Sequence, residues 1–530
     1  MRKPVCFALF CAMTCAAHAQ PAGGTSLADR PDAKEINFLD NAFAGTSNPA
    51  ALSFNTIHTL TRATVNTQFL RGGFHAIDES RRDNALSVDI FGLKRIGRLS
   101  LSGNIAYLNA KGYDHRWNNT ALLSDRNPFV LADSVASDVN REQFGMHAAA
   151  ALRLSEKLVA ALKFRFTTVA LSDQTDPRPK TNAMHFEVVP GIIRQLNGHN
   201  RIGVAGHIDV YRSDISHTVM NNLVNNVYFL MRGMGDYVQF TSGGNANYTR
   251  NYRGTRFAGS LQWHYTKGDA FGNMLEVRMA ENREMAEDGG ASYTYKGGDY
   301  DATQLDFYDR LTFRTGTSLW HQFILRAALA ADNGFWYDQV KRVDTEHANR
   351  TYYEVLNKSK VHRSVYTQAG LEYRLDERKG TDCSAWTAIF KSGVSTQETT
   401  HYEAESYKQK YSMLHAEADF TKRWKWNNSR IAATLGVCYA TGLGDPTYNS
   451  VRDKLVDSYS KPMFEYATAS QTGFKARLAV DIPVSMYGTP TWVTLYAQTL
   501  NTFYTSNNRY SAWYKNTSRS VIDAGVSLTL

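Results

Sequence analysis

Three ionisable residues, His415, Glu417 and Asp419, alternate along one short stretch of the chain. Because every second side chain of a β-strand lies on the same face, a strand here would bring the three together. An imidazole beside two carboxylates could bind a metal ion or serve in acid–base catalysis. The favoured interpretation is instead a polar wall, whose charges are balanced by neighbouring basic residues such as Lys475 and Arg477.

Other catalytic patterns are missing from the sequence. It contains no phosphate-binding loop, no H-E-x-x-H, no C-x-x-C pair and no G-x-S-x-G elbow. His207 and Asp209 are interpreted as polar wall residues too. Once a predicted leader is removed, Cys383 and Cys438 are the remaining cysteines, so neither a disulfide framework nor a thiolate cluster can form. They are expected to be separate wall residues, although they could also pair. We predict no catalytic residues, no metal and no cofactor.

The elements that position these residues are segments in which apolar and polar residues alternate. In each segment the charges lie on the face opposite the apolar one. A membrane barrel requires this, because a charge on its lipid face costs about 2–4 kcal/mol at mid-membrane. The candidate lumen-lining residues on the polar faces are Lys163, Arg165, His207, Asp209, Glu276, Arg278, Glu372, Arg374, His415, Glu417, Asp419, Lys475, Arg477 and Asp481.

Short and long connections alternate between these segments. Short ones are predicted near residues 94–97, 155–157, 196–200, 267–271, 315–318, 377–382, 425–429 and 485–490, and the longest loops at 112–138, 213–247, 338–360 and 442–463. Outer-membrane barrels have short periplasmic turns and longer external loops. We therefore expect an all-β fold, a transmembrane antiparallel up-and-down β-barrel of about 18 strands with both termini periplasmic. Counts of 14 or 16 are the alternatives.

The last stretch of the chain, Ser518 to Leu530, has an apolar residue at every second position from Ile522 onward. Its final eight residues resemble the C-terminal signal of outer-membrane β-barrels, with Leu530 where many relatives carry Phe. That resemblance implies recognition by the barrel-assembly machinery. We expect this strand to close the barrel against the segment near residues 57–70, with Leu528 facing lipid and Thr529 facing water.

The N-terminus predicts export. Arg2 and Lys3 precede an apolar run, and Ala17-His18-Ala19 fits a cleavage site, so residues 1–19 are expected to be a signal peptide. Residues 20–56 show no strand period. Within them Asn48, Pro49 and Ala50 resemble a segment of long-chain fatty-acid-transporter-like barrels, which implies a plug inside the lumen. The alternative is a turn before the first strand. Residues 57–530 are predicted to form the barrel.

Two further patterns give specific expectations. Within the loop at 213–247, six apolar residues recur at helical spacing, which predicts an amphipathic helix that constricts the mouth, lines an apolar ligand site or caps the rim. Aromatic residues cluster near strand ends, as in interfacial belts. Those near the short turns are Trp263, Tyr265, Trp424, Trp426, Tyr487 and Trp492; those near the outer ends are Tyr107, Tyr211, Trp336, Tyr337 and Tyr504.

Taken whole, the chain resembles uncharacterised outer-membrane β-barrel proteins of Bacteroidota, which carry domains of unknown function. The resemblance implies a location in the cell outer membrane and assigns no substrate. The scattered positive charge, formally +9, gives no nucleic-acid footprint. We expect a non-enzymatic, porin-like channel or transporter for an unidentified small solute. The alternative is a non-transporting scaffold or surface-binding protein that acts through its external loops. Expected partners are outer-membrane lipid, the assembly machinery, and the solute or an outer-membrane partner protein.

Overall fold

The computed structural model describes residues 32–221, 223, 225–242, 248–268, 270–289, 294–346, 350–378, 384–402, 407–448, 455–486, 489–505 and 513–530. The predicted signal peptide lies outside the described residues, as do Cys383 and Tyr487.

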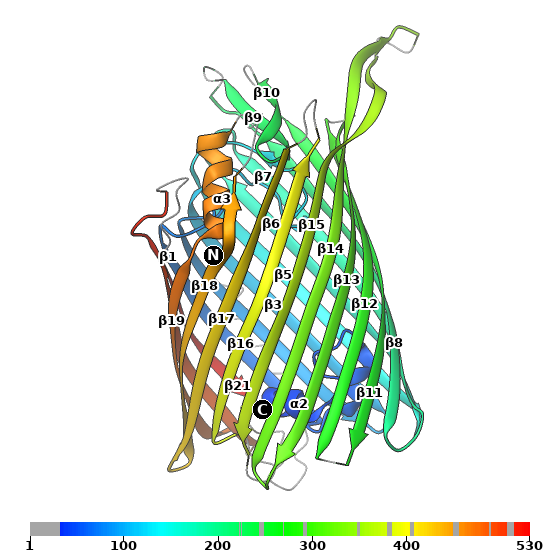
Figure 1. Ribbon diagram of the computed structural model, residues 1–530, viewed down its shortest axis with the longest axis vertical. Helices are drawn as coiled ribbons and strands as arrows, with labels where there is room; N and C mark the ends of the chain where they lie inside the picture. Colours follow the sequence, from blue (N-terminus) through cyan, green and yellow to red (C-terminus); the bar gives the residue numbers. More distant parts are fainter. Residues whose placement is uncertain are drawn as a thin grey trace.

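Eighteen antiparallel strands form one closed sheet (Figure 1). They are β1 (Thr59–Gly72), β2 (Arg82–Ile96), β3 (Leu99–His115), β5 (Ser137–Ser155), β6 (Leu158–Asp173), β7 (Pro179–Gln195), β8 (Asn200–His217), β11 (Thr249–Lys267), β12 (Phe271–Asp288), β13 (Tyr295–Thr315), β14 (Leu319–Asp344), β15 (Arg350–Glu377), β16 (Trp386–His401), β17 (Tyr407–Trp426), β18 (Ser429–Thr447), β19 (Gln471–Met486), β20 (Thr489–Tyr504) and β21 (Ser518–Thr529). Each pairs with the next, and β21 pairs with β1, with Val526 opposite Val65. The predicted 18-stranded up-and-down barrel is confirmed.

The outer surface of the barrel carries an apolar band. Leu261, Phe474 and Val204 are 60%, 55% and 55% exposed, because their side chains point away from the lumen. On β8 the apolar outward positions run from Ile202 to Val210, and the next outward residue is the exposed Arg212. A transmembrane strand needs about 9–11 residues. The band therefore matches the hydrocarbon thickness of a membrane. Within the described residues, no helix is both long and apolar enough to cross a membrane.

The aromatic residues divide differently from the prediction. Trp263, Trp424 and Trp426 are exposed at the short-turn end. At the other end, Tyr211, Trp336 and Tyr337 are buried, so the expected outer belt is wrong at these positions. Trp492 also faces inward, where the Arg430 guanidinium stacks on its ring, 4.8 Å from the centroid. Tyr211 is buried because every second residue of a strand lies on the same face, and it therefore shares the inner face with His207 and Asp209.

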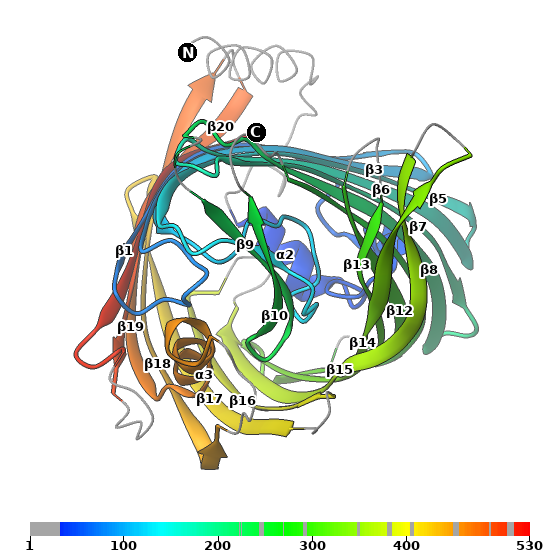
Figure 2. The same cartoon turned by 90° about the horizontal axis from the view of Figure 1, so that it is seen from above.

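Residues 226–242 contradict the predicted helix. They form the hairpin β9 (Asn226–Gly233) and β10 (Asp236–Ser242), which pairs with β4 (Leu131–Ala132) in a small three-stranded sheet. Val227, Tyr228 and Phe229 are residues that favour strands. Met234 and Gly235 have φ of +48° and +74°, as a two-residue type I′ turn requires. Figure 2 shows this hairpin lying across the mouth of the barrel.

The segment 338–360 is not a loop. β14 and β15 continue through most of it as a paired hairpin that rises beyond the barrel rim (Figure 1). The cross-strand ion pair between Arg342 and Glu354, 2.8 Å long, helps to hold this extension. Outside the membrane both faces of a hairpin can meet water, so no apolar period is needed. The sequence pattern therefore gave no strand signal here.

Short helices occupy the two ends of the barrel. α2 (Ala33–Asp40) and the 3₁₀ helix η2 (Pro49–Phe54) lie inside the ring of strands (Figure 2), at the short-turn end of the barrel (Figure 1). α3 (Lys461–Thr468) follows the π-helical turn η3 (Val456–Ser460) at the long-loop end. The core beneath η2 consists of Phe43, Ala50 and wall residues that include Ala151, Val159, Ile193 and Met274. The residues from 32 to 56, here called the N-terminal segment, thus pack inside the barrel.

Candidate functional site in the barrel lumen

Charged residues of opposite sign pair along the inner wall. Lys163 Nζ lies 3.2 Å from the carboxylate of Glu187, and the same carboxylate has Arg165 Nε at 3.6 Å and His207 Nδ1 at 3.4 Å. On the same strand as Glu187, His185 has its Nε2 3.0 Å from Asp209 of β8. Burying a charge is costly unless it is paired. These contacts therefore lower the cost of placing charged side chains on the inner wall of the folded barrel.

In the stretch from His415 to Asp419, which could have bound a metal, lysines of nearby strands balance the charges of the two carboxylates. Lys475 Nζ lies 2.7 Å from Asp419 and 3.2 Å from Glu417, and Lys391 Nζ lies 3.4 Å from Glu417. In the described part of the chain, no group of three or more His, Cys, Asp or Glu side chains is arranged to hold a metal ion. These contacts favour the polar-wall interpretation of the motif.

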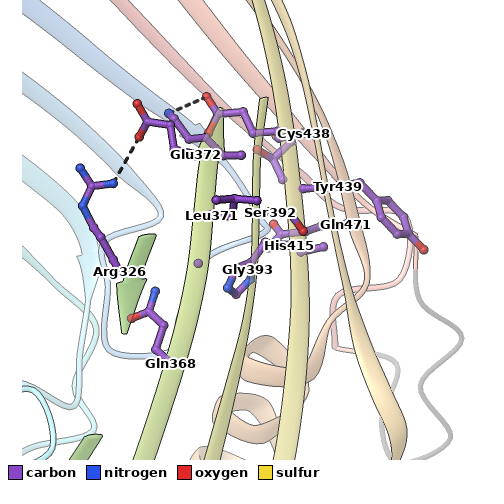
Figure 3. Close-up of a pocket in the computed structure, with 16 residues that line it drawn as sticks. Arg326, Gln368, Leu371, Glu372, Ser392, Gly393, His415, Cys438, Tyr439 and Gln471 are labelled. Carbon is purple, nitrogen blue, oxygen red and sulfur yellow. Dashed lines mark hydrogen bonds and ion pairs between the residues drawn. The ribbon is translucent and has the colours of Figure 1, made fainter. Parts of the chain in front are cut away.

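A hollow of about 390 Å³ follows the wall from β14 to β20 and is drawn in Figure 3. Arg326 and Glu372 form a 3.3 Å ion pair there, and His415 lines the same hollow. Tyr439 points to the opposite side of the sheet and is exposed. Elsewhere on the wall, Arg477 stacks on Tyr496, and Asp481 accepts a 2.7 Å hydrogen bond from Thr494.

Acidic residues of the N-terminal segment meet arginines of the wall. Glu35 contacts Arg374, and it also accepts from Arg423 at 3.1 Å. Arg374 is held in addition by Asp376, 2.6 Å from its Nε. The wall residues Arg378 and Arg430 pair with Asp40 and Asp32, at 2.8 Å and 3.5 Å. Charge-assisted hydrogen bonds are stronger than neutral ones. The N-terminal segment is therefore fixed electrostatically to the wall.

Asn48 is the best-anchored residue of this segment. Its side-chain nitrogen donates to the carbonyl oxygens of Ile192 and Val204 and to Gln262, at 3.1, 3.2 and 3.0 Å. Its side-chain oxygen caps η2 by accepting from the backbone of Ala50. A Cβ at Gly191 would lie 2.2 Å from the Asn48 oxygen, so only glycine allows this approach. Pro49 and Ala50 are buried. The three sequence-predicted residues thus lie inside the barrel.

The loop between β3 and β5, residues 116–136, enters the lumen from the other end. Glu284 accepts hydrogen bonds from Asn127, 2.5 Å away, and from the backbone of Ser124, 3.2 Å away, and it also contacts Tyr211. The Arg126 guanidinium forms a 2.5 Å ion pair with Asp332. Deeper in the loop, burial raises the pKa of the Asp133 carboxyl, against hydrogen bonds from Asn119 and Val135. The β3–β5 loop is thereby tied to the wall.

Replacing Glu284 by Ala should release this loop. Hydrogen bonds to a charged group contribute about 1.5–3 kcal/mol each, and 1.4 kcal/mol corresponds to a tenfold change. We expect proteolytic cleavage within residues 116–136 to accelerate at least about tenfold in detergent. Glu281→Ala is the matched control, because Glu281 lies on the same strand and is exposed on the outer face. Equal cleavage rates in the two variants would contradict the anchoring role.

Both inward segments line a hollow of about 560 Å³, here called the lumen cavity. Gly45, Thr46 and Ser47 of the N-terminal segment line it on one side, and Arg126 of the β3–β5 loop lines it on another. Its wall residues include Glu276, Arg278, Asp306, Tyr308, Arg326 and Tyr366. A second hollow of about 640 Å³, the mouth cavity, contains residues of α3 and also reaches Arg126. Arg126 therefore lies between the two spaces.

Several residues that line or anchor these cavities were not predicted from the sequence. Glu284 has the same parity as the predicted Glu276 and Arg278 on β12, so extending that face by six residues would have found it. Arg126 and the acidic residues of the N-terminal segment carry no strand signal at all. Their partners, such as Asp332 for Arg126, lie far away in sequence.

Closure of the barrel, its apolar outer band, and its alternation of short turns with long loops define an outer-membrane-type β-barrel. Its lumen is polar and is narrowed by two inward segments. The chain belongs to a family of unknown function, DUF6850, whose family model matches residues 49–530.

Comparison with curated proteins gives no match. Among solved structures, the outer membrane transporter YddB from Escherichia coli is similar, with 8% identity, a TM-score of 0.40, and coverage of 89% of this chain and 80% of that chain. The ferric preacinetobactin receptor BauA from Acinetobacter baumannii gives the same four values. The RagAB peptide transporter has 8% identity and a TM-score of 0.41, covering 89% of this chain and 86% of that one.

Proposed function

We propose that this protein is an outer-membrane channel or transporter that passes or captures a small solute. The observation that carries the proposal is the lumen cavity, which has charged residues in its lining and lies between the N-terminal segment and Arg126 of the β3–β5 loop. Barrels of about 16–18 strands leave an aqueous channel unless something fills them. A lumen that is narrowed at two levels, with space left between them, suits selective passage better than a solid pillar would. The proposal requires no catalytic step.

In this proposal the chain is exported with cleavage of residues 1–19, residues 20–56 form the plug, and residues 57–530 form the barrel. The short turns face the periplasm and the long loops face outward. The membrane lipid contacts the apolar band, and the assembly machinery recognises the last strand. The lumen-lining assignment of the charged wall residues belongs to the same proposal, supported by their pairing on the inner face. The more specific assignments, to Bacteroidota and to a plug like that of fatty-acid transporters, remain predictions.

Conductance in planar bilayers tests the channel directly. The full mature protein should conduct weakly, since the N-terminal segment fills the short-turn end. Deleting Gln20 to Asn55 removes the anchors made by Glu35, Asp40 and Asn48 and should raise the single-channel conductance severalfold. Heat-modifiable migration on a gel confirms that the shortened barrel is folded. Absence of conductance in both forms would end the channel proposal.

One observation favours the scaffold function as a second candidate. The extension of β14 and β15 beyond the rim exposes apolar side chains to water. These are Val340, Val343, Tyr352, Val355 and Leu356, between 37% and 58% exposed. Exposed apolar patches often mark interaction sites. If neither barrel form conducts, and a partner that co-purifies with the whole protein is lost when residues 340–356 are replaced by a short turn, the scaffold is favoured.

A further inference from the structure

The arginines that line the lumen cavity are not equally engaged. Arg126 pairs with Asp332 at 2.5 Å, and Arg326 pairs with Glu372 at 3.3 Å. Arg278 lines the same cavity, and among the described residues it interacts with charged side chains only at a distance, without a side-chain hydrogen bond. Its Nε is fully buried and has no hydrogen-bond partner. A buried donor without an acceptor is costly. Because that Nε is buried, a solute in the cavity would meet the terminal nitrogens of the Arg278 guanidinium.

The carboxylates near Arg278 are already occupied. Glu276 accepts from the backbone nitrogen of Ser47 at 3.2 Å and from Gln262 at 2.7 Å. Asp306 accepts from Gln304 at 2.6 Å. Neither carboxylate forms a hydrogen bond with Arg278, although both interact with it electrostatically at longer range. The Arg278 guanidinium is therefore left without a close acceptor, while the nearby carboxylates stay charged and hydrogen-bonded to neutral donors.

The other cationic groups face the same space with aromatic support. The Arg126 guanidinium lies 5.5 Å from the ring centroid of Tyr366, and that of Arg326 lies 5.4 Å from the centroid of Tyr308. Such stacking helps to fix the planes of these two guanidinium groups, whose edges contact Asp332 and Glu372. Three arginines therefore line the lumen cavity, together with the carboxylates of Glu276 and Asp306. Small-molecule sites have volumes of about 300–1,000 Å³, and this cavity, at about 560 Å³, falls within that range.

We propose that the lumen cavity binds a small anionic solute, whose carboxylate or phosphate group is held by Arg278. A guanidinium presents a planar fork that matches either group with two parallel hydrogen bonds. Arg126 and Arg326 line the same cavity but stay paired with Asp332 and Glu372, so Arg278 is the arginine that would bind the anion. This inference rests on the proposed function, because it names the class of solute. Ser47 of the N-terminal segment donates to Glu276, which lines the same cavity as Arg278. The anion would therefore bind next to the segment that narrows the lumen.

Calorimetric titration of the purified full-length protein in detergent tests the inference. The probes are succinate, inorganic phosphate, glucose and putrescine. We expect succinate or phosphate to bind, and the stronger of the two identifies the acidic group. Arg278→Gln should weaken that binding at least about tenfold, and Arg278→Lys by less, since the lysine keeps the charge and loses the fork. Arg477→Gln should bind as the parent does, because Arg477 is a lumen arginine that does not line this cavity.

Unchanged anion binding by Arg278→Gln would overturn the inference, as would binding of glucose or putrescine alone or of none of the four probes. Heat-modifiable migration establishes that each variant is folded before it is titrated. The outcome is separate from that of the conductance experiment. Anion binding that depends on Arg278 in a barrel that never conducts would support the anion site and reject the channel. Conductance without anion binding would reject the anion site alone.

Discussion

Deletion of Val526 to Leu530 is expected to abolish membrane assembly of this protein. The last strand pairs on both sides, with β1 and with β20, and so closes the barrel. Even the terminal residue takes part, because the Leu530 backbone donates to Thr61 at 2.8 Å and accepts from it at 2.9 Å. Without these residues, β1 and β20 would expose open edges in hydrocarbon. Each unpaired backbone group there costs several kcal/mol.

Single substitutions separate the two faces of this seam. Val526 is 48% exposed on the lipid face, and Val526→Arg should cost about 2–4 kcal/mol if it lies at the midplane, less toward the interface. Gln68 faces the lumen on β1 and donates to Asp523 at 2.8 Å, so Gln68→Arg adds the same charge beside a carboxylate and should assemble well. Membrane fractionation with protease protection measures both. If the deletion and the two substitutions all assemble equally well, β21 is not part of the barrel wall.

Thr529, which the sequence suggested as the water-facing counterpart of Leu528, is unsuitable as a control. Its side chain is completely buried inside the barrel, where it accepts a 3.3 Å hydrogen bond from Arg62 Nε. An arginine there would meet a like charge in a closed space. The alternation of residues correctly placed Thr529 on the inner face. It could not show that this part of the inner face is filled with protein rather than water.

The membrane-spanning wall was predictable because the bilayer penalises errors of sidedness. A charge on the outer face costs several kcal/mol, so strands such as the one from Ile202 to Val210 keep a strict period. Beyond the membrane a charge on the outer face costs little, so the alternation of apolar and polar residues is lost there. The hairpin extension near Arg342 and Glu354 lies beyond the rim and was expected to be a loop. The hairpin β9–β10 was expected to be a helix, because its apolar spacing fits both periods over a short run.

The lumen was predictable in kind and not in detail. Strand parity identifies Glu276 and Arg278 as neighbours on one face, but not that Ser47 engages the first and leaves the second without a partner. That distinction depends on a contact between residues 229 positions apart. The same holds for Arg126, whose acceptor Asp332 lies on a distant strand. Pairings of this length are set by the closed topology, which no local pattern encodes.

The N-terminal segment should detach when Arg310 is replaced by Ala. Arg310 is 3% exposed, and its guanidinium donates to three backbone carbonyls of the segment. The acceptors are the oxygens of Asn41 at 2.7 Å, Phe38 at 3.1 Å and Ala44 at 3.2 Å. A hydrogen bond to a charged donor contributes about 1.5–3 kcal/mol. Losing three would also leave buried carbonyls without a donor, so the expected effect is larger than for any one ion pair at Glu35.

Two readouts on folded, heat-modifiable protein measure this detachment. Protease cleavage between residues 32 and 56 should accelerate by more than about tenfold in Arg310→Ala, and its conductance should approach that of the barrel lacking Gln20 to Asn55. Arg314→Ala is the matched control, because Arg314 lies four residues further along the same face of the strand, is exposed, and stacks on Trp320. Arg310→Lys should be intermediate, since it keeps the charge but cannot reach three carbonyls at once. If Arg310→Ala and Arg314→Ala are cleaved at the same rate, the segment is held by its acidic residues and Asn48 rather than by this guanidinium.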